Sequence, residues 1–378
     1  MPNTKLADLK DEKSSSKQPL HFVKKTFPTP FDQHADVAST VISSMLTLED
    51  NCSLTRTSQN LHRLFSKRFN KILLLLKPLH QELLEHVIQG NFSEAKIIIE
   101  QYPISLLYKG TVIDYSNRKI TGTAYQMALG AEDGEMAKMI QSHLKQLPSG
   151  CAEIMRQEAQ QFPAHLKNQK KAEDAKKMKA LEVITQCIID AYDNEVTEDD
   201  DSNLKISPRL KIALTQFRNA LDPQGVITTG KHFHAPLLHK ALMLSIQYRD
   251  NFGSIKSAKH TLFWCQIIGY IQRFLPACYA QAFCQQNFRI FQFDAPLRHR
   301  SFKFKCNPDV SFFPLDRNPH DRLGFHYWLN LLGKSRSGYE LNTLFTDFSE
   351  LISIKENGMK NLMQHPALKR KRSCCLVM

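Results

Sequence analysis

Apolar residues recur every three or four positions through most of this chain, and this spacing constrains its fold more than any other feature. The clearest case is the segment 164–192, which is also rich in alanine and lysine, two residues that favour helix. Its single apolar stripe consists of Met178, Leu181, Ile184, Ile188 and Ala191. The same spacing marks the later segments 235–250, 258–285 and 337–356. We therefore expect a mainly α-helical fold.

Two pairs of shorter helices precede the long one. They are predicted at 80–89, 93–101, 124–129 and 135–144. The first pair is joined at Gly90-Asn91 and the second at Asp133-Gly134, and between the pairs the segment 111–123 alternates as a short hairpin does. Helix pairs that recur at a near-constant period, with an extended loop between them, indicate a solenoid.

The length of 378 residues is enough for two or three domains. We expect a disordered segment at 1–26, short helices at 27–70, helix pairs at 71–148, a long helix and acidic linker at 149–206, a helical domain at 207–360 and a basic tail at 361–378. The acidic residues of the linker are expected in a solvated loop, and the segment 286–325 is expected to be irregular. The acidic residues are Glu195, Glu198, Asp199, Asp200 and Asp201.

Several classes of protein are excluded by composition. No run of about 18 uncharged apolar residues could span a bilayer, and the first residues lack the apolar stretch of a secretory signal. The nine cysteines have no regular spacing, so reduced thiols in a cytosolic setting are expected. The net charge of +13 lies largely between Lys167 and Lys179, where a solvated helix face is expected, and at 369–372. No nucleic-acid motif accompanies either group, which argues against nucleic acid as a partner.

The last four residues, Cys375-Leu376-Val377-Met378, form a C-a-a-X box whose terminal methionine favours a farnesyl group on Cys375. A single prenyl chain binds membranes only marginally, so a second signal is needed. Two candidates are present. Palmitoylation of Cys374 is one, and the other is a basic run worth about 1 kcal/mol per residue against an anionic cytoplasmic leaflet. That run is Lys369, Arg370, Lys371 and Arg372. The sequence predicts a lipid-anchored tail with no other cofactor.

The segment 42–65 resembles an F-box. Five residues fall on matching positions of the family pattern, namely Leu46, Leu48, Asp50, Leu54 and Ser58. Asn51, Thr57 and Leu61 replace the leucine, valine and tryptophan that the family usually has. The resemblance implies docking on the Skp adaptor of a cullin–RING ubiquitin ligase, with Leu46, Leu48, Asp50 and Leu54 as the adaptor-binding residues. The alternative is an ordinary helical cap that buries these leucines.

The helix pairs resemble ankyrin repeats. The segments 123–129 and 135–140 match the two helices of a repeat in character, and 92–98 matches the second half of a preceding one. Gly90 and Glu132 occupy equivalent positions but lie 42 residues apart, against about 33 in the family, so the intervening finger is enlarged. The resemblance implies a protein-binding surface that carries no chemistry and packs on flanking helices.

No catalytic or metal-ligating constellation stands out. His232, His234 and His239 have no carboxylate partner or zinc spacing nearby in the sequence, and a polar loop and helix face are expected there. Cys278 and Cys284 are expected to be core thiols. An anionic ligand or plain surface charge could explain the remaining cluster, which is Arg298, His299, Arg300, Arg317, His320 and Asp321. We predict no catalytic residue and no metal.

An F-box-like segment, ankyrin-like pairs and a C-a-a-X tail in one chain resemble the prenylated F-box effectors that intracellular bacteria inject into host cells. The resemblance implies a receptor on the cytoplasmic face of a host membrane, with the Skp adaptor, a cullin, an anionic membrane surface and an unidentified target protein as partners. Two alternatives remain open. One is a lipid-anchored enzyme with its active site in 207–360, and the other is a binding scaffold without a ligase.

Overall fold

The computed structural model describes residues 77–147, 149–198, 204–222, 225–254, 257–284, 300–304, 307–312 and 339–364, which belong to one compact unit. Helix accounts for 71% of them, which confirms the predicted mainly α-helical fold. The predicted disordered segment 1–26, the predicted helices of 27–70 and most of the predicted tail lie outside the described residues.

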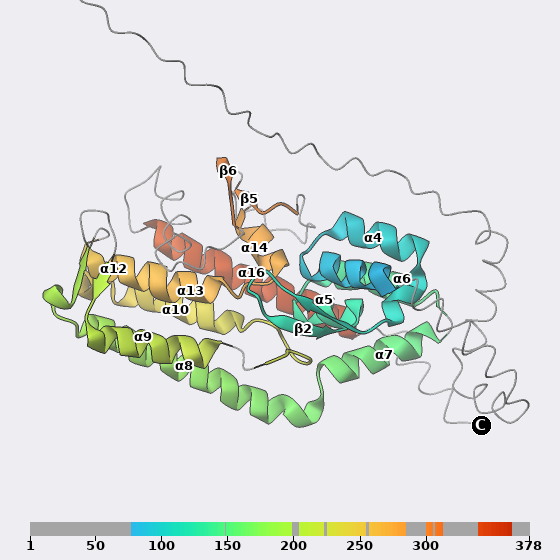
Figure 1. Ribbon diagram of the computed structural model, residues 1–378, viewed down its shortest axis with the longest axis horizontal. Coiled ribbons are helices and arrows are strands. Elements are labelled where there is room, and N and C mark those ends of the chain that lie inside the picture. Colours follow the sequence, from blue (N-terminus) through green and yellow to red (C-terminus); the bar gives the residue numbers. More distant parts are fainter. Residues whose placement is uncertain are drawn as a thin grey trace, which may run out of the picture. The chain divides into compact units, whose positions relative to one another are not determined.

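Both predicted helix pairs are present, and local sequence fixes their turns (Figure 1). Their helices are 77–88, α4 (Phe92–Gln101), α5 (Ala124–Gly130) and α6 (Gly134–Leu144). Gly90 turns the chain between the first two at φ +71°, a conformation that residues with a Cβ rarely adopt. Thr123 begins α5 in a capping box with Gln126, and Asp133 caps α6 by accepting a hydrogen bond from the backbone N–H of Met136.

The predicted hairpin also forms between the pairs. Its elements are the 3₁₀ turn η1 (Pro103–Leu107) and the antiparallel strands β1 (Gly110–Ile113) and β2 (Lys119–Gly122). Asp114 holds the tip by accepting hydrogen bonds from the backbone N–H groups of Ser116 and Arg118, both at 2.9 Å. Asn117, the other tip residue, adopts φ +60°, which asparagine tolerates well.

The long helix is close to its prediction. The segment comprises α7 (Gly150–Gln161), the 3₁₀ turn η2 (Ala164–Leu166) and α8 (Lys167–Ile189). The predicted stripe packs into a core, because Leu181, Ile184, Ile188 and Ala191 are buried and Met178 is partly buried. No residue along 162–180 is fully buried. The lysine-rich first half of α8 is therefore solvated, as the sequence predicts.

The acidic linker prediction is wrong for residues 193–198. They form the 3₁₀ turn η3 (Asp193–Glu195) and the strand β3 (Val196–Glu198), which pairs antiparallel with β4 (Leu204–Ile206). Glu195 accepts hydrogen bonds from Ser207 Oγ at 2.9 Å and from Arg209 at 2.9 and 3.1 Å. Partners more than ten residues away therefore order a segment whose acidic composition alone predicts a solvated loop. Residues 199–201 lie outside the described residues.

The second half of the chain is a helical array with two interruptions that the sequence analysis missed. Its elements are α9 (Pro208–Leu221), α10 (Ala235–Gln247), α11 (Arg249–Phe252), α12 (Ala258–Phe263), the π-helical segment η4 (Trp264–Ile268), α13 (Gly269–Gln272) and α14 (Ala277–Cys284). The single helix expected at 258–285 changes to π-helix at Trp264. It then ends before Pro276, which lacks the N–H that a helix needs.

The remaining elements come from the segment expected to be irregular and from the last helix. Strands β5 (Lys303–Phe304) and β6 (Asn307–Ser311) form a short antiparallel hairpin, which corrects the prediction for that part of 286–325. Helix α16 (Tyr339–Met363) runs further than the predicted 337–356. It contacts both α10 and α6, and so links the two halves of the described chain (Figure 1).

Two apolar cores result. One gathers the helix pairs, the hairpin and α7, and includes Leu84, Tyr125 and Ile140. The other gathers the stripe of α8 with α9, α10 and the helices up to α14, and includes Trp264 and Phe263. Helix α16 belongs to both, because its residues 348 and 351 are buried in the second core and its residues 359 and 362 in the first.

Candidate functional site

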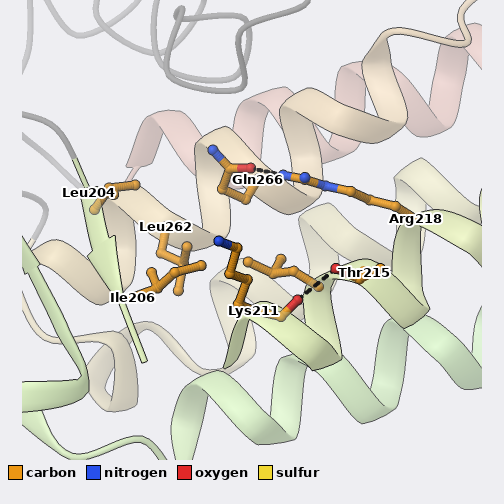
Figure 2. A pocket seen from close by; sticks show the side chains of 8 residues that line it. Leu204, Ile206, Lys211, Thr215, Arg218, Leu262 and Gln266 are labelled. Atoms are coloured by element: carbon orange, nitrogen blue, oxygen red, sulfur yellow. Dashed lines mark hydrogen bonds between the residues drawn. The ribbon is translucent and has the colours of Figure 1, made fainter. Parts of the chain in front are cut away.

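A cleft of about 320 Å³ lies between β4, α9 and the α12–η4 helix (Figure 2). Its lining residues, which define the cleft from here on, are Leu204, Ile206, Lys211, Leu214, Thr215, Arg218, Leu262 and Gln266. The four from α9 follow i, i+3, i+4 and i+7 spacing and so share one helix face. Leu204 and Ile206 are alternate residues of β4 and share one strand face. The volume is at the lower end of the range for ligand pockets.

The cleft holds two cationic side chains, and neither has an ion-pair partner among the described residues. Lys211 is exposed at the cleft. The half-buried guanidinium of Arg218 donates Nη2 to Gln266 Oε1 and lies 5.3 Å from the centre of the Tyr270 ring. Its Nε is buried and lacks a hydrogen-bond partner within the described part of the chain. Burial lowers the pKa of Arg218 below its ordinary value. Its charge is therefore held at a free-energy cost that an anion in the cleft would offset.

The cleft combines aliphatic side chains with cationic and hydrogen-bonding ones. Four of its residues are aliphatic, and its polar side chains are an amine, a guanidinium, a hydroxyl and an amide. The hydroxyl of Thr215 donates to the carbonyl of Lys211 at 2.8 Å. No carboxylate, imidazole or thiol is among the eight lining residues, so the set lacks the usual general bases and the thiol nucleophile. Gln266 lies on the π-helical segment, and such segments are frequent at functional sites.

A second group of charges lies at the turn between α5 and α6, and here opposite charges are matched. We call it the ionic joint, which consists of Glu132, Asp133, Lys231, Arg300 and Lys355. Arg300 donates Nη1 and Nη2 to the two carboxylate oxygens of Asp133 at 2.6 and 2.7 Å. Lys231 Nζ lies 2.7 Å from Glu132 Oε1, and Lys355 Nζ donates to the Glu132 carbonyl at 3.5 Å.

The electrostatics of the ionic joint follow from this matching. Burial alone would raise the pKa of Asp133, but the charge and hydrogen bonds of Arg300 outweigh it, so the pKa is lowered. Burial and the Glu132 carboxylate raise the pKa of Tyr279, whose hydroxyl donates to Glu132 Oε2 at 2.9 Å. Glu132 itself adopts φ +56°, which is strained for a residue with a Cβ. Its contacts with Lys231 and Tyr279 hold that conformation in place.

The β-hairpin tip is bound to the second half of the chain by a buried pair. Arg118 Nη2 lies 2.7 Å from Asp114 Oδ2, and Arg118 Nη1 donates to the carbonyl of His232 at 2.6 Å. The backbone N–H of His232 donates to the Gly130 carbonyl at 2.7 Å. Burial, with the charges of Arg118 and Lys170, lowers the pKa of His232 to about 3. This imidazole is therefore neutral at physiological pH and serves the packing of the two halves.

The residues that the sequence assigns to ligase and membrane binding cannot be placed. The adaptor-binding set Leu46, Leu48, Asp50 and Leu54 lies outside the described residues. So does the tail set Lys369, Arg370, Lys371, Arg372, Cys374 and Cys375. Both assignments stay predictions.

The other residues singled out from the sequence have structural partners. His234 has a carboxylate neighbour that is distant in the sequence, because Asp174 of α8 lies 3.8 Å from its Nε2. His239 shares a 2.7 Å hydrogen bond with the hydroxyl of Ser349 and stacks on an aromatic ring. Cys278 and Cys284 are buried core thiols, as predicted, and burial raises the pKa of Cys278 to about 11. Arg300 is neither a surface charge nor free for a ligand, because it is bound to Asp133.

Two kinds of feature are absent from the described residues, a metal-ligand group and a membrane-spanning helix. They contain no group of three or more potential metal ligands, and none of their helices combines the length and apolar character needed to cross a membrane. Comparison with protein-family models, curated proteins and solved structures returned no match. The function must therefore be argued from this chain's own residues.

Proposed function

We propose that this protein is a substrate receptor that recruits a cullin–RING ubiquitin ligase through residues 42–65 and binds its target with the helical body described above. The observation that carries the proposal is the match of Leu46, Leu48, Asp50 and Leu54 to the spacing of an F-box. Adaptor docking of this kind needs apolar side chains that enter a groove of the partner, and burial of one leucine contributes about 1.5–3 kcal/mol.

The described part of the chain suits the target-binding role in two respects. A target-binding body must keep its parts in a fixed relation, and the ionic joint with α16 binds the helix pairs to the second helical array. The cleft supplies cations and apolar side chains without carboxylate, imidazole or thiol. This composition supports a binding protein over the alternative of an enzyme with its active site in 207–360.

The test uses purified Skp adaptor and the full chain. The double variant Leu46→Ala, Leu48→Ala should bind the adaptor at least tenfold more weakly, since that factor requires only about 1.4 kcal/mol. Ile97→Ala is the matched control, because Ile97 is an exposed aliphatic residue, 54% exposed, on α4. Circular dichroism and melting temperature must stay near wild type. Failure of the wild-type chain to bind the adaptor removes the ligase function and leaves the scaffold or the enzyme.

The lipidated tail is a separate part of the proposal and has its own test. Mass measurement of the C-terminal peptide of the protein made in eukaryotic cells should find a farnesyl group on Cys375. Cys375→Ser should move the protein from membranes to cytosol. Gln in place of the basic residues 369–372 should weaken membrane retention while prenylation continues. A Cys375→Ser protein that stays on membranes contradicts the assignment.

A further inference from the structure

We propose that the cleft binds an extended peptide in which two acidic residues, three positions apart, flank aliphatic side chains. The identity of this peptide as part of the ubiquitylation target rests on the proposed function, but the binding itself does not.

The unmatched charge identifies the ligand as an anion. In the ionic joint and at the hairpin tip, buried cations meet carboxylates, as Arg300 meets Asp133 and Arg118 meets Asp114. At the cleft, Arg218 makes one hydrogen bond to a neutral amide and lies over an aromatic ring. Lys211 makes no ion pair within the described residues. A carboxylate that enters the cleft gains two charge-assisted partners without displacing an existing one.

The lining requires an aliphatic part beside that anion. Leu204, Ile206, Leu214 and Leu262 form the apolar part of the cleft, and they come from a strand and two helices. A purely polar anion such as phosphate would leave Leu204 and Ile206, the two that are only half buried, facing water. One large aliphatic side chain or a pair of them is comparable with a volume of about 320 Å³.

The spacing of the two cations favours a peptide over a lipid. Lys211 and Arg218 are seven residues apart on α9, which places their Cα atoms about 10 Å apart along the helix axis. A peptide in the extended polyproline II conformation has three residues per turn and rises about 3.1 Å per residue, so side chains i and i+3 lie on one side of it, about 9 Å apart. The single carboxylate of a fatty acid can satisfy only one of the two cations. Two acidic side chains with aliphatic residues between them can satisfy both.

The experiment measures the binding of six fluorescein-labelled, C-terminally amidated octapeptides to the full-length protein by fluorescence anisotropy. Each peptide has Gly-Ser before and Ser-Gly after four central positions, which carry two Glu and two Leu in every possible order. Glu-Leu-Leu-Glu should bind at least tenfold tighter than the other five, and its affinity should fall as salt is raised. Replacement of both Glu by Gln, or of both Leu by Ser, should cost at least tenfold.

The decisive variant is Lys211→Gln, Arg218→Gln, which should bind the Glu-Leu-Leu-Glu peptide at least tenfold more weakly than wild type. Lys171→Gln, Lys176→Gln is the matched control, since it removes the same charge from the exposed face of α8 and should bind as wild type does. Dodecanoate is added as a competitor. The proposal is overturned when no peptide binds, when the Gln peptide or the cleft variant binds as well, or when dodecanoate binds the cleft and no peptide competes.

Failure of this inference can be told apart from failure of the proposed function. Adaptor binding depends on residues 42–65, and peptide binding depends on α9 and β4. Adaptor binding without peptide binding leaves the receptor function standing and requires another target site. Peptide binding without adaptor binding removes the ligase and leaves a peptide-binding scaffold.

Discussion

Both the ionic joint and the cleft contain partly buried charged side chains, but the two regions differ in how these charges are paired. In the ionic joint, each carboxylate meets a cation, and Asp133 and Arg300 share two short hydrogen bonds. In the cleft, Arg218 is half buried with one hydrogen bond to an amide, and Lys211 has no ion-pair partner in the described part of the chain. The same chain therefore contains one charge cluster that is complete and one that is incomplete.

This difference in charge pairing has separate consequences for the stability of the fold and for the binding of a ligand. A buried ion pair is strongly destabilised by removal of one partner, because the other charge is left in a medium of low polarity. A cation that has no partner contributes little to folding, and its burial opposes folding. The ionic joint should therefore matter for the fold, and the cleft cations should matter for a ligand.

The largest effect is expected for Asp133→Asn. The substitution leaves the buried Arg300 with only the more exposed carboxylate of Glu135, and removal of one partner of a buried ion pair costs about 3–5 kcal/mol of the free energy of unfolding. Urea denaturation followed by circular dichroism measures it. Glu135→Gln is the control, because Glu135 also contacts Arg300, at 3.0 Å, but is more exposed. A loss below about 1 kcal/mol for Asp133→Asn would show that the ionic joint does not hold the two halves together.

Acid should weaken the fold through His232. Its pKa is lowered to about 3 from 6.5, so the unfolded chain takes up a proton below pH 6.5 that the folded chain does not. Stability is complete above pH 6.5 and falls toward pH 3 by up to about 1.4 kcal/mol per pH unit, or about 2 kcal/mol between pH 6.5 and 5.

The control for this prediction is His232→Phe, which cannot titrate. Burial also lowers the pKa of His80, His234 and His239, so the variant should flatten the pH dependence without abolishing it. The pKa of Asp133 is lowered as well, and its contribution is lost only as the pH falls below about 3.8. An unchanged slope between pH 6.5 and 5 in His232→Phe contradicts the assignment.

A smaller loss in the free energy of unfolding is expected for Gly130→Ala, because the backbone of α5 lies close to His232 at this position. A Cβ added at Gly130 would meet Nε2 of His232, and this buried ring has little room to move. Overpacking of this kind costs about 1–3 kcal/mol, of which the higher helix propensity of alanine recovers up to about 1 kcal/mol. Gly130→Ala should therefore lower the free energy of unfolding slightly. Gly134→Ala is the control, since nothing lies within 4 Å of its Cβ position.

The helices were predictable because their signals are local. The stripe of Leu181, Ile184 and Ile188, the capping residues and the two helix–turn–helix units can all be read from neighbouring positions. The break before Pro276 was a local signal that the sequence analysis overlooked, since proline ends helices. The capping residue Asp133 was correctly expected at a turn, but its burial was not.

The candidate site was not predictable in the same way. The cleft is formed by β4, α9 and η4. Arg300 is bound to Asp133, which lies 167 residues earlier in the chain. No pattern within a single sequence predicts contacts of this kind. Asp174 approaches His234 from another helix for the same reason. The spacing of Lys211, Leu214 and Arg218 was a usable hint, because it puts two cations and a leucine on one face of α9. The cleft also needs Leu204 of β4 and Leu262 of α12, whose positions beside α9 the spacing does not predict.

The free energy of unfolding of Lys211→Gln, Arg218→Gln, compared with that of Asp133→Asn, distinguishes a binding cleft from a structural joint. Both proteins are unfolded in urea under the same conditions, without peptide. We expect the cleft variant to stay within about 1 kcal/mol of wild type, as surface substitutions do, while Asp133→Asn loses several times more. A cleft variant that loses about 3 kcal/mol or more would mean that these cations hold the fold together, and the distinction between a structural joint and a binding cleft would be wrong.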